Sequence, residues 1–250
     1  MPEIRLRSAD AGWERTVVST RDFGENPTHF FLDLAYAPNG QSLAYRRSGS
    51  DGESIWVSAT SAEPPVRLVP EPGGAIQQDP TWSPDGNWIA YLSVKGAQYT
   101  LEKARVGGNQ TPVTVAKGMG TQPKWSPKGD AIALIAPGGG VNLVAADGSS
   151  PRQIGSSEWL AIAWTRHGSR LLGLEKTADR HLALSWIDTA SGAETRISDL
   201  GAIPAAFGYG SMTGLTPVKG MSVAPDGKTV TVSLLRVRSD LWLLQGLSRR

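Results

Sequence analysis

A turn-centred motif that occurs five times is the feature of this sequence that most constrains its fold. In the fullest copy, TWSPDGNWIAY at residues 81–91, a Pro-Asp-Gly turn joins two short apolar runs. Pro84 fixes φ at the second position of this turn, while Asp85 and Gly86 supply side-chain hydrogen bonding and a positive φ. The other copies are LAYAPNGQSLAY, PKWSPKGDAIAL, IAWTRHGSRLLG and MSVAPDGKTVTV, and successive turn glycines lie 46, 43, 39 and 59 residues apart.

Each copy of the motif is followed by two more short strand-like segments. The third strand of each unit is SIWVSA, YTLEKA, VNLVAAD, LALSWID or DLWLLQ, and the fourth is PVRL, PVTV, PRQI or TRI. Four short strands per unit, separated by glycine turns and without a long helical period, are typical of a propeller blade. The sequence therefore predicts an all-β fold, a β-propeller built from four-stranded antiparallel blades.

The repeats define one domain over residues 1–250, which is within the size range of a single all-β domain. We expect five motif-bearing repeats at about 30–70, 76–116, 119–155, 158–198 and 217–247.

The first 18 residues predict a partial blade at the N-terminus. IRLR (4–7) and ERTVV (14–18) resemble a third and a fourth strand without a preceding motif. We expect ERTVV to close the ring by pairing with DLWLLQ (240–245), which would protect a sheet edge. IRLR is then either an extra edge strand or part of a longer propeller. The sequence therefore agrees with a ring of five blades and with a ring of six.

The residue before each turn, which is aromatic in four of the five copies, is interpreted as scaffold. Trp82 and Trp125 precede their turns, and alternating apolar residues follow, so one face of each strand can pack on the neighbouring blade. A position that recurs in every repeat is better explained by blade packing than by ligand stacking. The structural motif residues are Trp82, Pro84, Asp85, Gly86, Trp125, Pro127, Gly129, Pro225, Asp226 and Gly227.

Charge and composition exclude several classes of partner and site. The formal net charge of +2 gives no electrostatic footprint for nucleic acid or for an anionic membrane. The absence of cysteine excludes disulfides and cysteine-based zinc sites. The chain as given has no run of eighteen apolar residues and no continuous apolar segment of a signal peptide. The compartment stays open: cytoplasmic for the chain as it stands, periplasmic or extracytoplasmic if a segment precedes it.

Catalytic and cofactor motifs are not assembled in this sequence. The chain has three histidines, and none is spaced from another as a metal-ligand pair, although His29 could face the end of the channel. GYGSMTG (208–214) has neither the spacing of a nucleophile elbow nor that of a dinucleotide loop. We expect no cofactor, no metal and no enzymatic activity.

The remaining candidate site is the set of positions at the mouth of the central channel. We place these positions just before each innermost strand, where they differ from blade to blade. The alternative is that they are ordinary loop residues that satisfy strand ends. The ring of positions contains Phe31 and Asp33, Gln77 and Asp79, Gly120 and Gln122, Trp159 and Ala161, and Val218 and Gly220; the candidate binding residues among them are Phe31, Asp33, Gln77, Asp79, Gln122 and Trp159.

The motif also resembles a known family. The W-S-P-D-G turn of residues 82–86, repeated as W-S-P-K-G, A-P-D-G and A-P-N-G, resembles the repeat of TolB-type, WD-repeat-like bacterial β-propellers. Residues 214–247 are similar to the end of propellers fused behind bacterial Ser/Thr protein kinases or winged-helix transcriptional regulators. Thr165–Gly168 departs from the pattern because it lacks both the Ser and the Pro.

The resemblance implies a non-catalytic interaction or sensor module that binds a protein, a peptide or a small ligand, either in the cell envelope or as part of a larger signalling protein. We expect a monomer that does not insert into a membrane. The alternative is a propeller enzyme, either a hydrolase or lyase or the gating propeller of a serine peptidase, with a metal near Asp33 and Asp79. A third possibility is a fragment with little function alone.

Overall fold

The computed structural model describes residues 2–7, 12–24, 30–61, 63–70, 73–107, 111–202, 218–223 and 230–234. Their strands form four four-stranded and two two-stranded antiparallel sheets. The first two complete sheets contain β3 (Phe30–Tyr36), β4 (Ser42–Gly49), β5 (Gly52–Ala59) and β6 (Val66–Arg67), then β7 (Ile76–Trp82), β8 (Trp88–Lys95), β9 (Gln98–Arg105) and β10 (Val113–Lys117). The next two contain β11 (Thr121–Trp125), β12 (Ala131–Ile135), β13 (Val141–Ala145) and β14 (Arg152–Ile154), then β15 (Trp159–Trp164), β16 (Arg170–Lys176), β17 (His181–Asp188) and β18 (Glu194–Ala202). The two-stranded sheets are β1 (Glu3–Arg7) with β2 (Glu14–Ser19), which precedes a 3-10 turn at Thr20–Phe23, and β19 (Val218–Val223) with β20 (Val230–Leu234).

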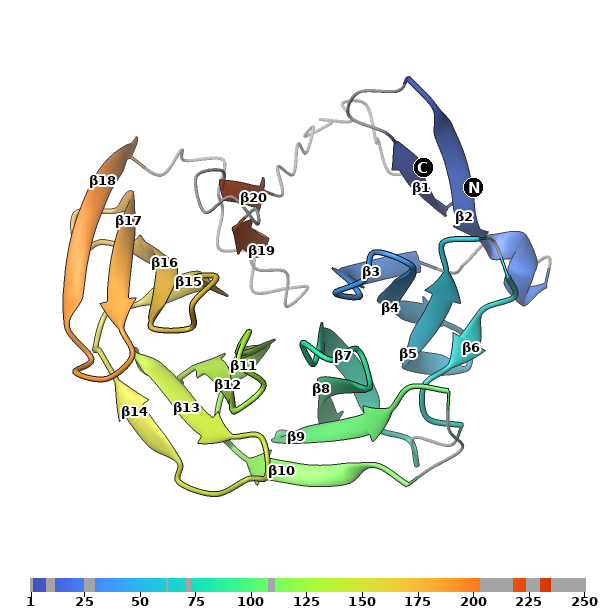
Figure 1. Ribbon diagram of the computed structural model, residues 1–250, viewed down its shortest axis with the longest axis horizontal. Helices are drawn as coiled ribbons and strands as arrows, with labels where there is room; N and C mark the ends of the chain where they lie inside the picture. The colour runs from blue at the N-terminus through green and yellow to red at the C-terminus, as the bar shows by residue number, and fades with distance from the viewer. Residues whose placement is uncertain are drawn as a thin grey trace, which may run out of the picture.

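The sheets are arranged around a common centre, as Figure 1 shows. The first strand of each motif-bearing sheet, β3, β7, β11, β15 or β19, lies innermost. In the four complete sheets each strand pairs with the next in sequence, so that the fourth strand is outermost. This arrangement is a β-propeller of four-stranded antiparallel blades, and the predicted fold class is confirmed. None of the described residues belongs to a helix long and apolar enough to cross a membrane.

The motif turns owe their shape to local hydrogen bonds. The Asp85 carboxylate accepts the Ser83 hydroxyl at 2.5 Å and the backbone N–H of Asn87 at 3.1 Å, while Gly86 has φ 72°. An L-residue with a side chain reaches that φ only at a cost, so glycine is favoured there. Pro225, Asp226 and Gly227 lie outside the described residues, and so does the segment 240–245 that we expected to pair with ERTVV.

The hydrophobic core lies between neighbouring blades, because alternate residues of each middle strand face opposite sides. Ile89 and Tyr91 of β8 pack toward the preceding blade, whereas Ala90 and Leu92 pack toward the following one. The motif tryptophans join the blades through hydrogen bonds as well. For example, the Trp82 indole N–H donates to the Ala35 carbonyl at 3.0 Å.

The two N-terminal strands pair with each other. β1 and β2 form an antiparallel hairpin, so the IRLR segment is the partner of ERTVV. Val18 of this hairpin packs in one cluster with Leu43 and Tyr45 of β4, and all three side chains are fully buried. The first complete blade packs on the second blade with one face. The hairpin covers the outer part of its opposite face.

Candidate functional site

A β-bulge interrupts the innermost strand of each motif-bearing sheet. The register of β3, β7 and β11 with their partners shifts next to Asp33, Asp79 and Gln122. These three residues have φ of 51°, 54° and 52°, a left-handed conformation that is uncommon for residues other than glycine. The sequence prediction placed them just before the strands. They lie within the strands instead, because the bulge accommodates an extra residue and the strand continues.

The bulges are linked from blade to blade by hydrogen bonds. The backbone N–H of Asp79 donates to Asp33 Oδ2 at 3.4 Å, and the backbone N–H of Gln122 lies near enough to the Asp79 carboxylate to favour its charged form. The Gln122 side-chain amide then donates to the carbonyl of Leu160, the bulged residue of β15, at 3.0 Å. We call Asp33, Asp79, Gln122 and Leu160 the bulge ring. Three of the predicted mouth residues thus lie in one series of contacts that passes from blade to blade.

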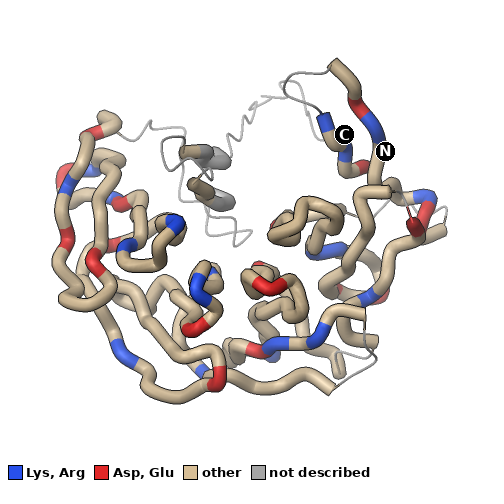
Figure 2. The backbone as a smooth tube through the Cα atoms, in the orientation of Figure 1, with Lys and Arg blue, Asp and Glu red and all other residues tan. Residues whose placement is uncertain are grey.

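Two cations lie beside the carboxylates of the bulge ring. Arg46 Nε lies 2.7 Å from Asp33 Oδ2, and its Nη1 lies 2.8 Å from Glu53. Lys124 is partly buried, and its desolvation lowers its pKa, whereas the nearby Asp79 and Asp33 oppose that change. Burial, followed by repulsion from Asp33, raises the pKa of Asp79 to about 6. Figure 2 shows acidic and basic positions on the inner strands around the centre.

The other predicted mouth residues are packed into the structure. Phe31 is partly buried, with its ring centroid 5.6 Å from that of Tyr45. Gln77 is buried, and its side-chain carbonyl accepts the Ile55 N–H at 3.1 Å. Gln77 is therefore held within the fold, whereas part of the Phe31 ring stays exposed.

Trp159 does not lie where the sequence placed it. Its side chain is only 4% exposed and packs in the core between the third and fourth complete blades. A Cβ atom on Gly173 would fall 2.2 Å from the indole ring, so the ring occupies the space that this glycine leaves open. The expectation that Trp159 offers an aromatic surface at the mouth is therefore wrong.

The raised pKa of Asp79 predicts a pH-dependent stability. A carboxyl whose folded pKa lies above its unfolded value of about 3.9 stabilises the fold fully at low pH. That contribution decreases as pH rises from about 4 to 6, by at most about 1.4 kcal/mol per pH unit. Asp79→Asn keeps an acceptor for the Gln122 N–H and removes the titration. We expect the variant to show a smaller loss of stability between pH 4 and 6.5 in urea unfolding.

The matched control is Asp85→Asn in a solvent-exposed turn. Hydrogen bonds from Ser83 and Asn87 lower the Asp85 pKa, so its contribution is lost as pH falls rather than as it rises. Its substitution should change the pH dependence in the opposite direction below about pH 5 and leave the slope between pH 5 and 6.5 nearly unchanged. A slope between pH 4 and 6.5 that Asp79→Asn leaves unchanged would contradict the assignment.

A second candidate site lies at the end of the channel where the inner strands enter the motif turns. We call this end of the channel the turn face. It holds a cavity of about 310 Å³. The cavity is lined by Pro38, Trp82, Pro84, Trp125, Ser126, Pro127, Trp164, Thr165, Arg166 and Val223. These residues come from all five motif-bearing repeats, so the turn-face cavity exists only when the blades are assembled.

The tryptophans of this cavity are mostly buried, and the small surface that they turn to the cavity is apolar. The indole N–H of Trp164 donates to the Lys124 carbonyl at 2.8 Å, and that of Trp125 donates to the Gly129 carbonyl at 3.3 Å. With the Trp82 bond to Ala35, each of the three indole N–H groups already has an acceptor within the protein. Arg166 is the one cation that lines the cavity as described, and its side chain is exposed. From the sequence these tryptophans are predicted only as scaffold, because their position recurs from repeat to repeat.

Titratable clusters that fit metal chemistry are absent from the part of the chain that the structure describes. No three His, Asp or Glu side chains there are grouped to hold an ion. His181 pairs with Asp199 at 2.9 Å on the exposed outer part of its blade, and this contact raises the His181 pKa. His29 lies outside the described residues.

Known proteins resemble this chain in short segments of sequence. No protein-family model matches it. It is 30% identical over 111 residues, 41% of the chain, to "Uncharacterized peptidase YuxL" of Bacillus subtilis, and 45% identical over 58 residues, 22% of the chain, to "Tol-Pal system protein TolB" of Francisella tularensis. The matched segments span 16% and 13% of these relatives, so the chain corresponds to a small part of each.

Solved structures match most of the chain. TolB from Acinetobacter baumannii superposes with a TM-score of 0.63 at 14% identity, covering 79% of this chain and 49% of that one. Putative TolB from Agrobacterium tumefaciens gives 0.63 at 18% identity, covering 85% and 75%. The chain has a TolB-like β-propeller fold. An oligogalacturonate lyase in complex with manganese also superposes on this TolB-like propeller, with a TM-score of 0.61 at 11% identity, covering 86% of this chain and 59% of the lyase. The fold is therefore shared by proteins with different functions.

Proposed function

We propose that this TolB-like propeller is a non-catalytic binding module that takes a short apolar segment of a protein or peptide at the turn-face cavity. The observation that carries the proposal is the lining of that cavity by exposed prolines and by tryptophans whose polar groups are already bonded. Proline and aromatic side chains of a peptide pack well on such surfaces.

The single cation of the cavity favours a ligand that carries a negative charge. Arg166 lies on the turn of the fourth complete blade and adds a positive charge to a site whose other lining residues are uncharged. A carboxylate next to the apolar segment would meet this guanidinium in a charge-assisted hydrogen bond. The ligand class is therefore a peptide with a proline–aromatic pair beside an acidic residue. Such recognition fits an interaction or sensory role within a larger signalling protein.

The groups around the cavity favour binding over catalysis. Its hydroxyl groups take part in the turns: Thr165 Oγ1 donates to the Arg170 carbonyl at 2.9 Å, and Ser126 Oγ accepts the Lys128 N–H at 3.2 Å. The lining residues include no carboxylate and no histidine that could act as an acid or a base.

Substitution of an exposed lining proline tests the proposal. Pro127→Asp places a charge on the apolar wall at a turn position that tolerates aspartate. We expect it to weaken binding of a labelled proline–aromatic–acidic peptide by about tenfold, equivalent to about 1.4 kcal/mol, in fluorescence anisotropy. Arg166→Glu should reverse the preference, so that a lysine-flanked peptide binds better than the acid-flanked one.

The matched control is Pro151→Asp, which makes the same change at an exposed proline before β14, away from the cavity. It should leave binding within about twofold of wild type, a difference of about 0.4 kcal/mol. Equal binding by wild type and Pro127→Asp, or no binding of either peptide, would rule out this use of the cavity.

A further inference from the structure

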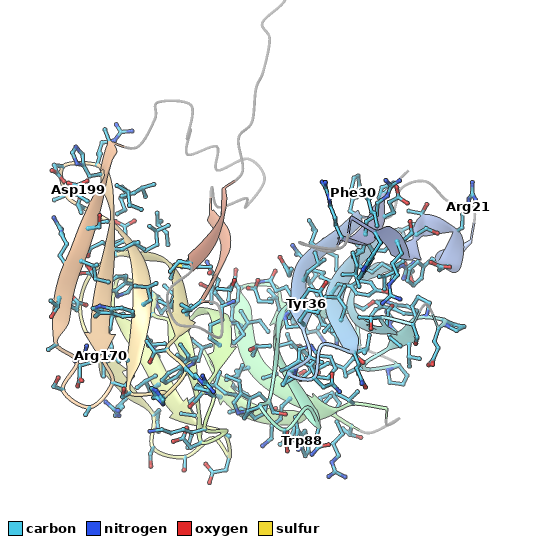
Figure 3. All side chains as sticks on the ribbon, turned by 45° about the horizontal axis from the view of Figure 1, so that its top comes forward. Arg21, Phe30, Tyr36, Trp88, Arg170 and Asp199 are labelled. Carbon is cyan, nitrogen blue, oxygen red and sulfur yellow. The ribbon has the colours of Figure 1, made fainter. Side chains whose placement is uncertain are left out.

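The inner strand of the first complete blade exposes two apolar side chains whose counterparts are buried. Aligned on their bulges, Leu34 and Tyr36 of β3 correspond to Pro80 and Trp82 of β7. Pro80 is buried and Trp82 is 8% exposed, whereas Leu34 is 52% and Tyr36 is 53% exposed. The third blade follows the buried pattern, with Pro123 and Trp125 in these places. Figure 3 labels Tyr36 at the end of β3 opposite Phe30.

The buried counterparts are covered by the preceding blade. Trp82 packs in the cluster between the first and second complete blades, and its indole N–H bonds to Ala35 of β3. Likewise, β11 packs against β7, and β15 packs against β11. The face of β3 that carries Leu34 and Tyr36 is therefore the one that a preceding inner strand would cover.

The outer half of that preceding blade is already present. β1 and β2 have the bulge found in β9 and β10: the pairing skips Val17 in one hairpin and Val115 in the other. Both valines are buried, and the two hairpins correspond as the third and fourth strands of a blade. β1–β2 buries Leu43 and Tyr45 of β4, while the inner strand β3 stays exposed beside them. Figure 1 shows β1 on the side of β2 that faces the ring.

We infer that the exposed face of β3 is a docking surface for a β-hairpin. This hairpin resembles the two inner strands of the other blades, and its chain continues directly into β1. In each complete sheet the first two strands lie inside the third and fourth. The occupant would therefore supply the inner strands of the blade whose outer strands are β1 and β2. Its second strand would pair with the inner edge of β1, and its apolar face would cover Leu34 and Tyr36. Docking completes one more blade of the ring.

The chain contains the hairpin needed to test this docking. Residues 76–97 comprise β7, the motif turn, β8 and the two-residue turn that leads into β9. Matching the bulges equates Leu101 of β9 with Ile4 of β1, so Gln98 corresponds to Met1. We therefore fuse residues 76–97 directly before Met1. In this fusion the added hairpin precedes Ile4 of β1 by the same number of residues as it precedes Leu101 of β9 in its own blade.

The test compares Leu34→Glu in the fused and the unfused chain by thermal unfolding. In the unfused chain the substitution should lower Tm by less than about 1 °C, because the side chain stays in water. In the fused chain it should lower Tm by about 5 °C or more, because a charge is buried under the hairpin. Val66→Glu, at another exposed apolar position on the outermost strand β6, should have the same small effect in both chains.

Two results would overturn the inference. An equally small effect of Leu34→Glu in both chains would show that the hairpin does not dock on β3. An equally large effect in both would show that residues within 1–250 already cover this face. If the fused Leu34→Glu chain fails to fold, hydrogen exchange of the fused wild type decides instead: the β3 amides should exchange at least about tenfold more slowly than in the unfused chain. Unchanged exchange would reject the inference, and Leu92→Asp in the added hairpin should abolish the protection.

Discussion

Gly120→Ala should destabilise the protein by about 4 kcal/mol, because two separate costs fall on one residue. Gly120 precedes β11 with φ 128°, a conformation that L-residues rarely adopt. A Cβ atom at this position would fall 2.0 Å from the carbonyl oxygen of Ile135, and a backbone atom within a sheet cannot move aside as a flexible side chain can. Urea unfolding of wild type and variant at pH 7 measures the difference.

Gly138→Ala separates the cost of the positive φ from the cost of the close contact with Ile135. Gly138 also has a positive φ, 81°, but no atom lies within 4 Å of its hypothetical Cβ. We expect a loss of about 1 kcal/mol there, from the backbone conformation alone. Equal losses in the two variants would show that the close approach of Gly120 to Ile135 does not matter for stability.

Asp33→Ala should lower the free energy of unfolding by about 3 kcal/mol, because it leaves a buried cation without its closest partner. The Arg46 side chain is only 12% exposed, and Asp33 lies 2.7 Å from its Nε. The substitution also removes the acceptor of the Asp79 N–H, so one link of the bulge ring is lost. Because Asp33 raises the Asp79 pKa by repulsion, the same variant should titrate Asp79 at lower pH in NMR.

Glu53→Ala is the matched control, since Glu53 contacts the same guanidinium at 2.8 Å. Glu53 is 29% exposed against 10% for Asp33, so solvent screens its interaction more strongly. We expect a loss of at most about 1 kcal/mol and no displacement of the Asp79 titration. A Glu53→Ala loss as large as that of Asp33→Ala would contradict a special role for the bulge ring.

The strand order within the blades could be predicted from sequence because the information is local. The turn at Pro84–Gly86 depends on residues that are neighbours in the chain, and alternation along β8 shows that its two faces pack on different blades. Each of the four complete sheets has the predicted third and fourth strands, from β5 and β6 to β17 and β18. A repeated local pattern is sufficient to predict such a fold.

The bulges could not be predicted, and they decide which residues form the bulge ring. Left-handed conformations at Asp33, Asp79 and Gln122 are not signalled by glycine, and each bulge shifts which residues face the channel. Trp159 was predicted at the mouth because it comes just before an inner strand, whereas the space left by Gly173, 14 residues later, places it in the core.

By itself, the sequence determined the repeated four-stranded unit, the turns that join its first two strands and the apolar faces available for packing. Only the tertiary structure decided which residues meet at the centre. The bulge ring joins Asp33, Asp79 and Gln122, and the turn-face cavity joins Pro38, Pro84 and Pro127, from blades about 40 residues apart in the chain. Such contacts depend on how the blades are arranged around the axis and on local bulges, and neither is encoded by the spacing of the motif alone.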